Sequence, residues 1–326
     1  MRAWQALEYC EPDGMRLNHV DVPHPGPSQV RIRNRAAALN FFDLLQIQGK
    51  YQVKAPLPMT PGAEVAGIVD AIGTGVTNVA VGDKVLAFTH GGGYAELSIA
   101  DSFRTFHMPP GMDFAEAAAL PIVYHTSLFA LKQRTALREG EWLLVHAGAS
   151  GVGMSAIQIG KALGARVIAT AGEKRKLDFA LAQGAEQAVD YSTPDWIDRV
   201  KEITGRHGAD VIYDPVGGDI FDQSTKCIAQ EGRILVIGFA GGRIPAIQTN
   251  RLLLKNISVV GVFWGDYANS RPWYLSETET ALEAMYEAGQ IRPVVGNRYK
   301  LDQAPAAMRD LADRKVIGKA VLEIGK

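Results

Sequence analysis

The chain of 326 residues has little cysteine, with Cys10 and Cys227 as its two thiols. Two thiols are too few for a disulfide framework or for a four-cysteine zinc site. The seven histidines are scattered along the chain, and neither a His-Glu-x-x-His nor a Cys-x-x-Cys pattern occurs. We therefore expect no protein-bound metal ion.

An excess of charge of one sign is also absent. Lys and Arg number 34 against 35 for Asp and Glu, which gives a formal net charge of −1 at pH 7. A chain this balanced has no global electrostatic attraction to nucleic acid or to an anionic membrane. We therefore expect neither nucleic acid nor a membrane as a partner.

Long apolar runs are missing as well. No run approaches the roughly 18 residues that a spanning helix needs, and the start of the chain, Met1 to Glu8, reaches an acid before an apolar segment develops. These absences favour a cytoplasmic protein. Hydrophobic residues nevertheless make up 47% of the chain, which is typical of a folded protein with a core. The length predicts about two domains.

The first part of the chain reads as β-rich and irregular. Residues 29–34 alternate polar and apolar side chains, as a half-buried strand does. Residues 64–72 and 81–88 are further runs of β type, and glycine and proline punctuate the connections. This composition predicts a compact, partly open β-barrel.

The middle of the chain changes character. Residues 114–137 have helical spacing, with Asp113 as a predicted N-cap and Glu116 three residues on. From residue 142, apolar strands alternate regularly with helices, which predicts an α/β fold with a parallel, doubly wound sheet. The predicted strands are 142–147, 166–170, 188–190, 211–213, 233–237 and 257–262, the predicted helices are 151–163, 174–183, 196–204 and 276–289, and a last strand covers 320–324.

The strongest motif is the turn His146-Ala147-Gly148-Ala149-Ser150-Gly151-Val152-Gly153, between a predicted strand and a predicted helix. Small residues let the backbone approach a pyrophosphate, and the free N–H groups at the start of a helix bind it. Ser150 fills the middle position of the usual G-x-G-x-x-G pattern. A purely structural turn is the alternative, but the strand–turn–helix context favours dinucleotide binding.

The end of the second strand of this region bears on the choice of cofactor. Sites that prefer NAD place Asp or Glu there to bond the ribose 2′-hydroxyl, but this chain has Thr170-Ala171-Gly172. Gly172 leaves room for a phosphate, and the cations of residues 174–176 follow Glu173. This pattern favours NADPH, and a solvated charged helix start is the alternative explanation of the cations.

Further segments are typical of one superfamily, and together with the glycine-rich turn they cover almost the whole chain. They are Leu39–Asp43, Gly49–Tyr51, Pro61–Gly67, Val81–Val85, Asp214–Gly218 and Gly318–Leu322. The sequence resembles the medium-chain dehydrogenase/reductase superfamily, and within it the zinc-free quinone oxidoreductase family that includes zeta-crystallin. Ala63 stands where zinc-dependent alcohol dehydrogenases carry a histidine ligand, and their early ligand cysteine is missing near Asn40.

The resemblance implies a GroES-like catalytic domain, residues 1–122 and 265–326, built around a Rossmann domain, residues 123–264. It also implies NADPH as cofactor and hydride transfer to a quinone or an α,β-unsaturated carbonyl. The implied cofactor residues are Ser150, Gly151 and Val152 at the pyrophosphate, Gly172, Lys176, Tyr191 and Arg314 at the 2′-phosphate, and Thr126, Val216, Phe239 and Phe263 along the nicotinamide half.

Asn40 and Tyr51 resemble the family's polar residues at the substrate mouth. Negative charge grows on the substrate oxygen during hydride transfer, so we expect one of these side chains to donate a hydrogen bond to it, directly or through water. The alternatives are a packed loop aromatic for Tyr51 and a backbone-bonding turn residue for Asn40. Leu45 stands where some relatives carry a tyrosine, and Trp264 either roofs the pocket or fills the domain interface.

Two other functions stay open. The protein could reduce 2-enoyl thioesters or alkenals, or it could bind NADPH with little activity, as in family members recruited as lens crystallins. The apolar strand 257–262 would leave an exposed edge in last position. Pairing with its copy across a twofold axis would cover that edge, so we expect a homodimer.

Overall fold

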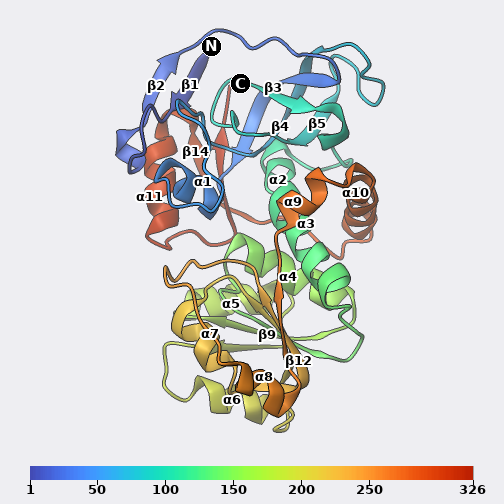
Figure 1. Ribbon diagram of the computed structural model, residues 1–326. Helices are drawn as coiled ribbons and strands as arrows, with labels where there is room; N and C mark the ends of the chain where they lie inside the picture. Colours follow the sequence, from blue (N-terminus) through green and yellow to red (C-terminus); the bar gives the residue numbers. More distant parts are fainter. Residues whose placement is uncertain (326) are drawn as a thin grey trace. The chain divides into compact units, whose positions relative to one another are not determined.

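The computed structural model describes residues 1–325, and the chain divides into two compact units (Figure 1). The first unit comprises Met1–Ile122 and Pro293–Lys326, and the second comprises Val123–Arg292. The resemblance implies that the Rossmann domain ends at residue 264, and the second compact unit of the structure ends at Arg292. Within the second unit, the ring of Phe129 lies 4.8 Å from that of Tyr267 and 5.8 Å from that of Tyr274.

The first unit is built on a seven-stranded sheet of order β14-β15-β3-β4-β5-β7, with β6 paired to β3. All pairings are antiparallel except β14 with β15. A separate two-stranded sheet joins β1 and β2. The strands are β1 Arg2–Gln5, β2 Arg16–His19, β3 Gln29–Ala38, β4 Glu64–Ile72, β5 Lys84–Phe88, β6 Leu97–Asp101, β7 Thr105–His107, β14 Val295–Lys300 and β15 Lys319–Glu323.

The alternation of side chains along β3 determines which of its residues belong to the core of this unit. Val30 and Ile32 of β3 point inward and are fully buried, as the pattern of residues 29–34 predicts. The end of the chain completes the sheet, because β15 pairs with β3 through Val321 and Ala38. The helices of the unit are α1 Phe41–Ile47, α2 Phe114–Ala118 and α11 Ala304–Ala312, with short 3-10 turns at Pro12–Gly14, Ser102–Arg104 and Leu301–Gln303.

The second unit contains a six-stranded, wholly parallel sheet of order β10-β9-β8-β11-β12-β13. All four residues of β8 are buried, as the apolar run that begins at Trp142 predicts. The strands are β8 Trp142–Val145, β9 Arg166–Ala171, β10 Gln187–Asp190, β11 Ala209–Asp214, β12 Ile228–Val236 and β13 Ser258–Gly261. The predicted doubly wound α/β fold is therefore confirmed.

Helices connect successive strands of this sheet (Figure 1). They are α4 Gly151–Ala162, α5 Lys174–Ala182, α6 Trp196–Ile203, α7 Gly218–Ser224 and α8 Thr249–Lys255. Helix α3 Pro121–Leu128 precedes β8, and the helices α9 Trp264–Asn269 and α10 Pro272–Glu287 follow β13. No helix among residues 1–325 is both long and apolar enough to cross a membrane.

One helix prediction is wrong in its length. The expected helix over 114–137 is split into α2, α3 and a π-helical segment at Phe129–Arg134. The interruption falls before Pro121, which lacks an N–H and is tolerated at the first position of a helix but not in its interior. The predicted cap is confirmed, because the side chain of Asp113 accepts a 2.7 Å hydrogen bond from the backbone N–H of Glu116.

Candidate functional site

The order of the strands in the second unit reverses at β8. Strands β9 and β10 lie on one side of β8, and β11, β12 and β13 lie on the other. In open parallel sheets, ligands bind outside the carboxyl ends of the strands at such a switch point. Two loops meet there: the glycine-rich turn after β8, and the loop Asp214–Gly218 after its neighbour β11.

Close packing shapes the glycine-rich turn. A Cβ added at Gly153 would lie 2.2 Å from the carbonyl oxygen of Ala147, and one at Gly148 would lie 2.9 Å from Cβ of Ala169. Ser150 is the N-cap of α4, and its hydroxyl accepts a 3.1 Å hydrogen bond from the N–H of Gly153. Because these two glycines have no side chain, the start of the helix can pack closely against the strand ends, as dinucleotide binding requires.

The predicted pyrophosphate residues Ser150, Gly151 and Val152 all lie at the start of α4. Backbone N–H groups in the first turn of a helix have no acceptor within the helix, and they carry the positive end of its dipole. The first turn of this helix contains no acidic residue. This position suits a phosphate anion.

His146, the first residue of the turn, is a structural support. Its ring is fully buried, with Nδ1 2.8 Å from Thr170 Oγ1 and Nε2 2.8 Å from Ser224 Oγ. Burial lowers the pKa of His146 to about 3, so the ring is neutral. It links the end of β8 to β9 and α7.

Three of the four predicted 2′-phosphate residues gather at the ends of β9 and β10. A Cβ at Gly172 would lie 3.5 Å from Cε2 of Tyr191, which follows β10. Lys176 lies in the first turn of α5, and its ammonium is 2.7 Å from the carboxylate of Glu173. Arg314, the fourth residue, follows α11 in the first unit.

The residues predicted along the nicotinamide half come from several loops. Oδ1 of the buried Asp214 accepts hydrogen bonds from the N–H groups of Val216 at 2.8 Å and Gly217 at 3.0 Å, which fixes the loop after β11. Phe239 lies beside this loop, because a Cβ at Gly217 would be 3.1 Å from its ring. The structure thus brings Val216 and Phe239 together. The other two predicted residues are Thr126 on α3 and Phe263 at the N-cap of α9.

In the first unit, Asn40 is held in a buried charged cluster. Lys319 Nζ donates to Asn40 Oδ1 at 2.7 Å, to Glu64 Oε1 at 2.8 Å and to the carbonyl oxygen of Leu39 at 2.9 Å. Asn40 Nδ2 in turn donates to Glu64 Oε1 at 2.8 Å. All three ammonium protons therefore have an acceptor, and the Asn40 amide is bound at both ends. This geometry favours a positioning role for Asn40.

Asp43 is a functional candidate that the sequence reasoning missed. Its carboxylate is fully buried, and Oδ2 accepts hydrogen bonds from the N–H of Asn40 at 2.9 Å and from the hydroxyl of Tyr94 at 3.0 Å. Oδ1 has no hydrogen-bond partner among the residues that the structure describes. Burial raises the pKa of Asp43 to about 7. The Asn-x-x-Asp spacing at the start of α1, typical of a helix cap, was the available signal.

Tyr51 lies near this carboxylate. Burial raises the pKa of its hydroxyl, and the charge of Asp43 raises it further. Its ring is 5.7 Å from that of Phe42 and is only partly exposed. Tyr51 therefore keeps its proton at neutral pH, so it can donate a hydrogen bond but cannot serve as a base.

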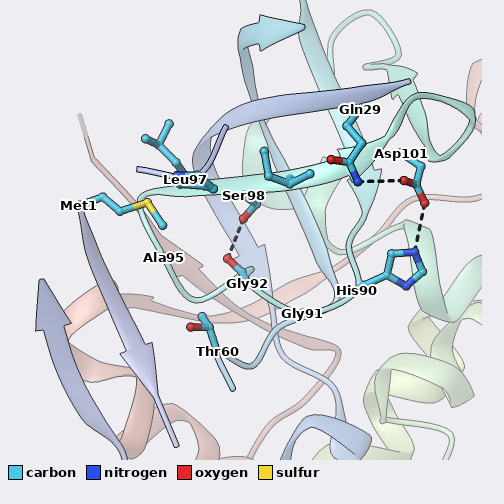
Figure 2. Close-up of a pocket in the computed structure, with 12 residues that line it drawn as sticks. Met1, Gln29, Thr60, His90, Gly91, Gly92, Ala95, Leu97, Ser98 and Asp101 are labelled. Atoms are coloured by element: carbon cyan, nitrogen blue, oxygen red, sulfur yellow. Dashed lines mark hydrogen bonds and ion pairs between the residues drawn. The ribbon is translucent and has the colours of Figure 1, made fainter. Parts of the chain in front are cut away.

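A separate pocket of about 310 Å³ lies in the first unit, along β6 (Figure 2). His90 Nε2 lies 3.1 Å from Asp101 Oδ2, and Gln29 Nε2 lies 3.5 Å from the other oxygen of the same carboxylate. None of the residues predicted for the site lines this pocket.

No group of three or more His, Cys, Asp or Glu side chains in residues 1–325 is arranged to hold a metal ion. Cys10 is partly buried and Cys227 is buried, and neither forms a disulfide.

Comparison with known proteins gives consistent matches. Residues 26–110 match the family model of the alcohol dehydrogenase GroES-like domain, and residues 151–290 match that of the zinc-binding dehydrogenase. Quinone oxidoreductase-like protein 2 of Bos taurus is 38% identical over 93% of this chain and 87% of its own length. Quinone oxidoreductase of Pseudomonas aeruginosa is 36% identical over 98% of both chains. The crystal structure of Escherichia coli quinone oxidoreductase complexed with NADPH superimposes with a TM-score of 0.92 at 28% identity, over 99% of this chain and 100% of the other.

Proposed function

Because the chain belongs to the quinone oxidoreductase family of the medium-chain dehydrogenases/reductases, we propose that it reduces a quinone or an α,β-unsaturated carbonyl with hydride from NADPH and without a metal ion. The observation that carries this proposal is the glycine-rich turn at the switch point between β8 and β11. Oxidoreductase activity and a nicotinamide cofactor follow from the family. The acceptor, the choice of NADPH and the absence of a metal are the parts that we propose.

The residues of the second unit fit a dinucleotide. The cradle at Gly148 and Gly153 has no space for side chains, and the start of α4 offers N–H groups to a pyrophosphate. Lys176, together with Gly172 and Tyr191, would hold a 2′-phosphate. The resemblance adds Arg314 of the first unit to the proposed cofactor residues. Val216, Phe239, Thr126 and Phe263 would border the nicotinamide half. When bound, the reduced nicotinamide supplies the hydride.

The first unit would supply the groups that act on the substrate. A hydrogen-bond donor aimed at the substrate oxygen stabilises the negative charge that grows there. Tyr51 fits this role, because a tyrosine hydroxyl is protonated at neutral pH, and the raised pKa of Tyr51 favours this form further. Asn40, whose amide is bound by Lys319 and Glu64, would position the loop that precedes α1. Quinones are good hydride acceptors, so few catalytic side chains are needed.

The donor set also argues against a catalytic zinc ion. Ala63 occupies the place where the zinc-dependent relatives have a histidine ligand, and neither Cys10 nor Cys227 lies in a cluster of metal-ligating side chains among the described residues. We therefore expect turnover to survive treatment with a strong chelator. A loss of activity that added zinc restores would contradict this part of the proposal.

We also propose a homodimer. Strand β13 is an edge of the parallel sheet, and Val259 on it is partly exposed. Leu253 and Leu254 on the preceding helix α8 are each 75% exposed. An apolar strand edge with exposed leucines next to it is typical of an association surface. Pairing with a second copy of the chain would cover both the open edge and the leucines.

A turnover assay tests the function. The protein is mixed with NADPH and a panel of quinones, enones and 2-enoyl thioesters, and the absorbance of the reduced cofactor is followed. We expect turnover with quinones or simple enones. Turnover with thioesters alone would support the enoyl reductase alternative. Tight NADPH binding without turnover of any acceptor would support a cofactor-binding protein and contradict the enzyme proposal.

A further inference from the structure

The carboxylate of Glu173 binds two cations at the start of α5. Its Oε1 lies 2.7 Å from Lys176 Nζ, and its Oε2 lies 3.0 Å from Arg175 Nε. Glu173 is the N-cap residue of this helix, yet its side chain makes no cap hydrogen bond. Hydrogen bonds from Arg175 and Lys176 lower the pKa of Glu173 to about 2, so the carboxylate is ionised at neutral pH.

Glu173 directly follows Gly172 at the carboxyl end of β9. In this fold, the residues at the end of the second strand of the sheet contact the adenosine ribose and decide between a 2′-hydroxyl and a 2′-phosphate. The resemblance assigns Lys176 to the phosphate and leaves Glu173 without a role. The structure joins the two residues in one ion pair.

A 2′-phosphate and Glu173 compete for the same lysine. Phosphate and carboxylate oxygens are both acceptors for the ammonium protons of Lys176. A phosphate monoester carries roughly −1.5 to −2 charges at neutral pH and is repelled by a nearby carboxylate. A ribose 2′-hydroxyl instead donates a hydrogen bond to a carboxylate. The same side chain therefore disfavours NADPH and favours NADH.

We propose that Glu173 is a specificity-determining residue that weakens the preference for NADPH set by Lys176 and makes NADH a usable second cofactor. This inference rests on the proposed function, because it assigns a role within the dinucleotide site. Asp178 offers a matched comparison. It is a carboxylate on the same helix, and it pairs at 2.8 Å with Lys174, which the resemblance does not place at the 2′-phosphate.

A binding measurement tests this inference without any need for turnover. Isothermal titration calorimetry on the full chain gives dissociation constants for NADPH, NADH, adenosine 2′,5′-bisphosphate and adenosine 5′-monophosphate. The last two probes differ only in the 2′-phosphate, so they isolate its contribution. The variants are E173Q, which removes the charge and keeps the size of the side chain, K176M and the control D178N.

In E173Q we expect tighter NADPH binding and weaker NADH binding. Each shift should be roughly 2- to 5-fold, the size of an exposed charge interaction, so the preference for NADPH should rise by about 10-fold. The preference for the bisphosphate over the monophosphate should rise in the same direction. K176M should lower both preferences, and D178N should leave them within about 2-fold of the wild type.

The outcomes separate this inference from the proposed function. If the wild type binds NADPH and E173Q shifts both dinucleotides equally or neither, the inference is overturned and the proposed function stands. If E173Q and D178N raise the preference equally, the effect is general electrostatics, and the inference is likewise overturned. If the wild type binds neither dinucleotide, the proposed function fails and this inference fails with it.

Discussion

Lys319 Nζ lies 2.8 Å from Glu64 Oε1, and both side chains are almost completely buried. The two residues are 255 positions apart, so the contact ties the first residue of β15 to the first residue of β4. Asn40 contacts both partners through its amide. This cluster therefore fixes the chain just before α1, the helix that carries Asp43.

Breaking this buried ion pair should be strongly destabilising. K319M leaves the carboxylate of Glu64 buried without its cation, which costs about 3–5 kcal/mol of unfolding free energy. The double variant E64Q/K319M should lose less, because it leaves no uncompensated charge. Urea unfolding provides the measurement. E186Q, which breaks the exposed pair of Glu186 with Arg166, is the control and should cost under about 1 kcal/mol. Equal costs for K319M and E186Q would contradict the account.

Asp43 should make the stability of the fold depend on pH. Burial raises its pKa to about 7, against about 3.9 for an exposed aspartate. The folded state therefore holds this proton more tightly than the unfolded state does. The resulting stabilisation is fully present below about pH 4 and is lost as the pH rises toward 7, by up to about 1.4 kcal/mol per pH unit.

D43N removes the titrating carboxyl group, so a comparison with the wild type should show how much Asp43 contributes to the pH dependence of stability. Between pH 5 and pH 8, D43N should gain about 2 to 3 kcal/mol of unfolding free energy relative to the wild type. Urea unfolding at the two pH values checks this expectation, with D198N as a control at an exposed carboxylate on α6. A difference between D43N and the wild type that is the same at both pH values would show that Asp43 does not titrate in this range.

Tyr51 should matter for catalysis and not for cofactor binding. Y51F removes the hydroxyl that we assign to the substrate oxygen, and loss of one such donor lowers kcat by roughly 10²-fold or more with demanding acceptors. The loss should be smaller with quinones, which need less stabilisation. Steady-state kinetics with an enone and a quinone, together with the Kd of NADPH, provide the measurements. Y286F on α10 is the control. An unchanged kcat for Y51F with both acceptors would remove Tyr51 from the mechanism.

Gly153 should be irreplaceable in the glycine-rich turn. G153A places a Cβ 2.2 Å from the carbonyl oxygen of Ala147, so the turn must move. We expect the affinity for NADPH to fall by more than about 10-fold, because the helix start loses its position at the pyrophosphate. G265A is the control, since a Cβ at Gly265 meets nothing within 4 Å. If a folded G153A protein bound NADPH with the affinity of the wild type, the cofactor would not bind at this turn.

The edge strand β13 should govern the oligomeric state. We expect the wild type to be a dimer in solution by light scattering, and V259D to be a monomer, because a charge on an edge strand opposes strand pairing. V81D changes an exposed valine in the first unit and should remain dimeric. Equal masses for wild type and V259D would show that this edge is not the interface.

Local patterns predict much of this structure. The alternation at residues 29–34, the apolar run at Trp142 and the turn around Ser150 all report interactions between residues close in sequence, and each lies where it is expected. The broken helix at Pro121 shows that apolar spacing alone does not determine continuity, because a missing N–H overrides it.

Contacts between residues that are far apart in the sequence could not be predicted from local sequence patterns. Lys319 and Glu64 reveal their partnership only after the sheet brings β15 and β4 to β3. The same limit applies to the packing of Phe129 against Tyr267 and Tyr274 within the second unit. Glu173 was visible in the sequence, but its choice of Lys176 as a partner is set by side-chain geometry.

Hydride transfer from the cofactor is the central claim, and isotope transfer tests it most directly. The protein is incubated with an enone and NADPH that carries deuterium on the transferred face of nicotinamide C4, and the product is analysed by mass spectrometry and NMR. The account predicts one deuterium on the product carbon β to the carbonyl, in proportion to the NADPH consumed. Consumption of NADPH with no deuterium in the product would contradict it.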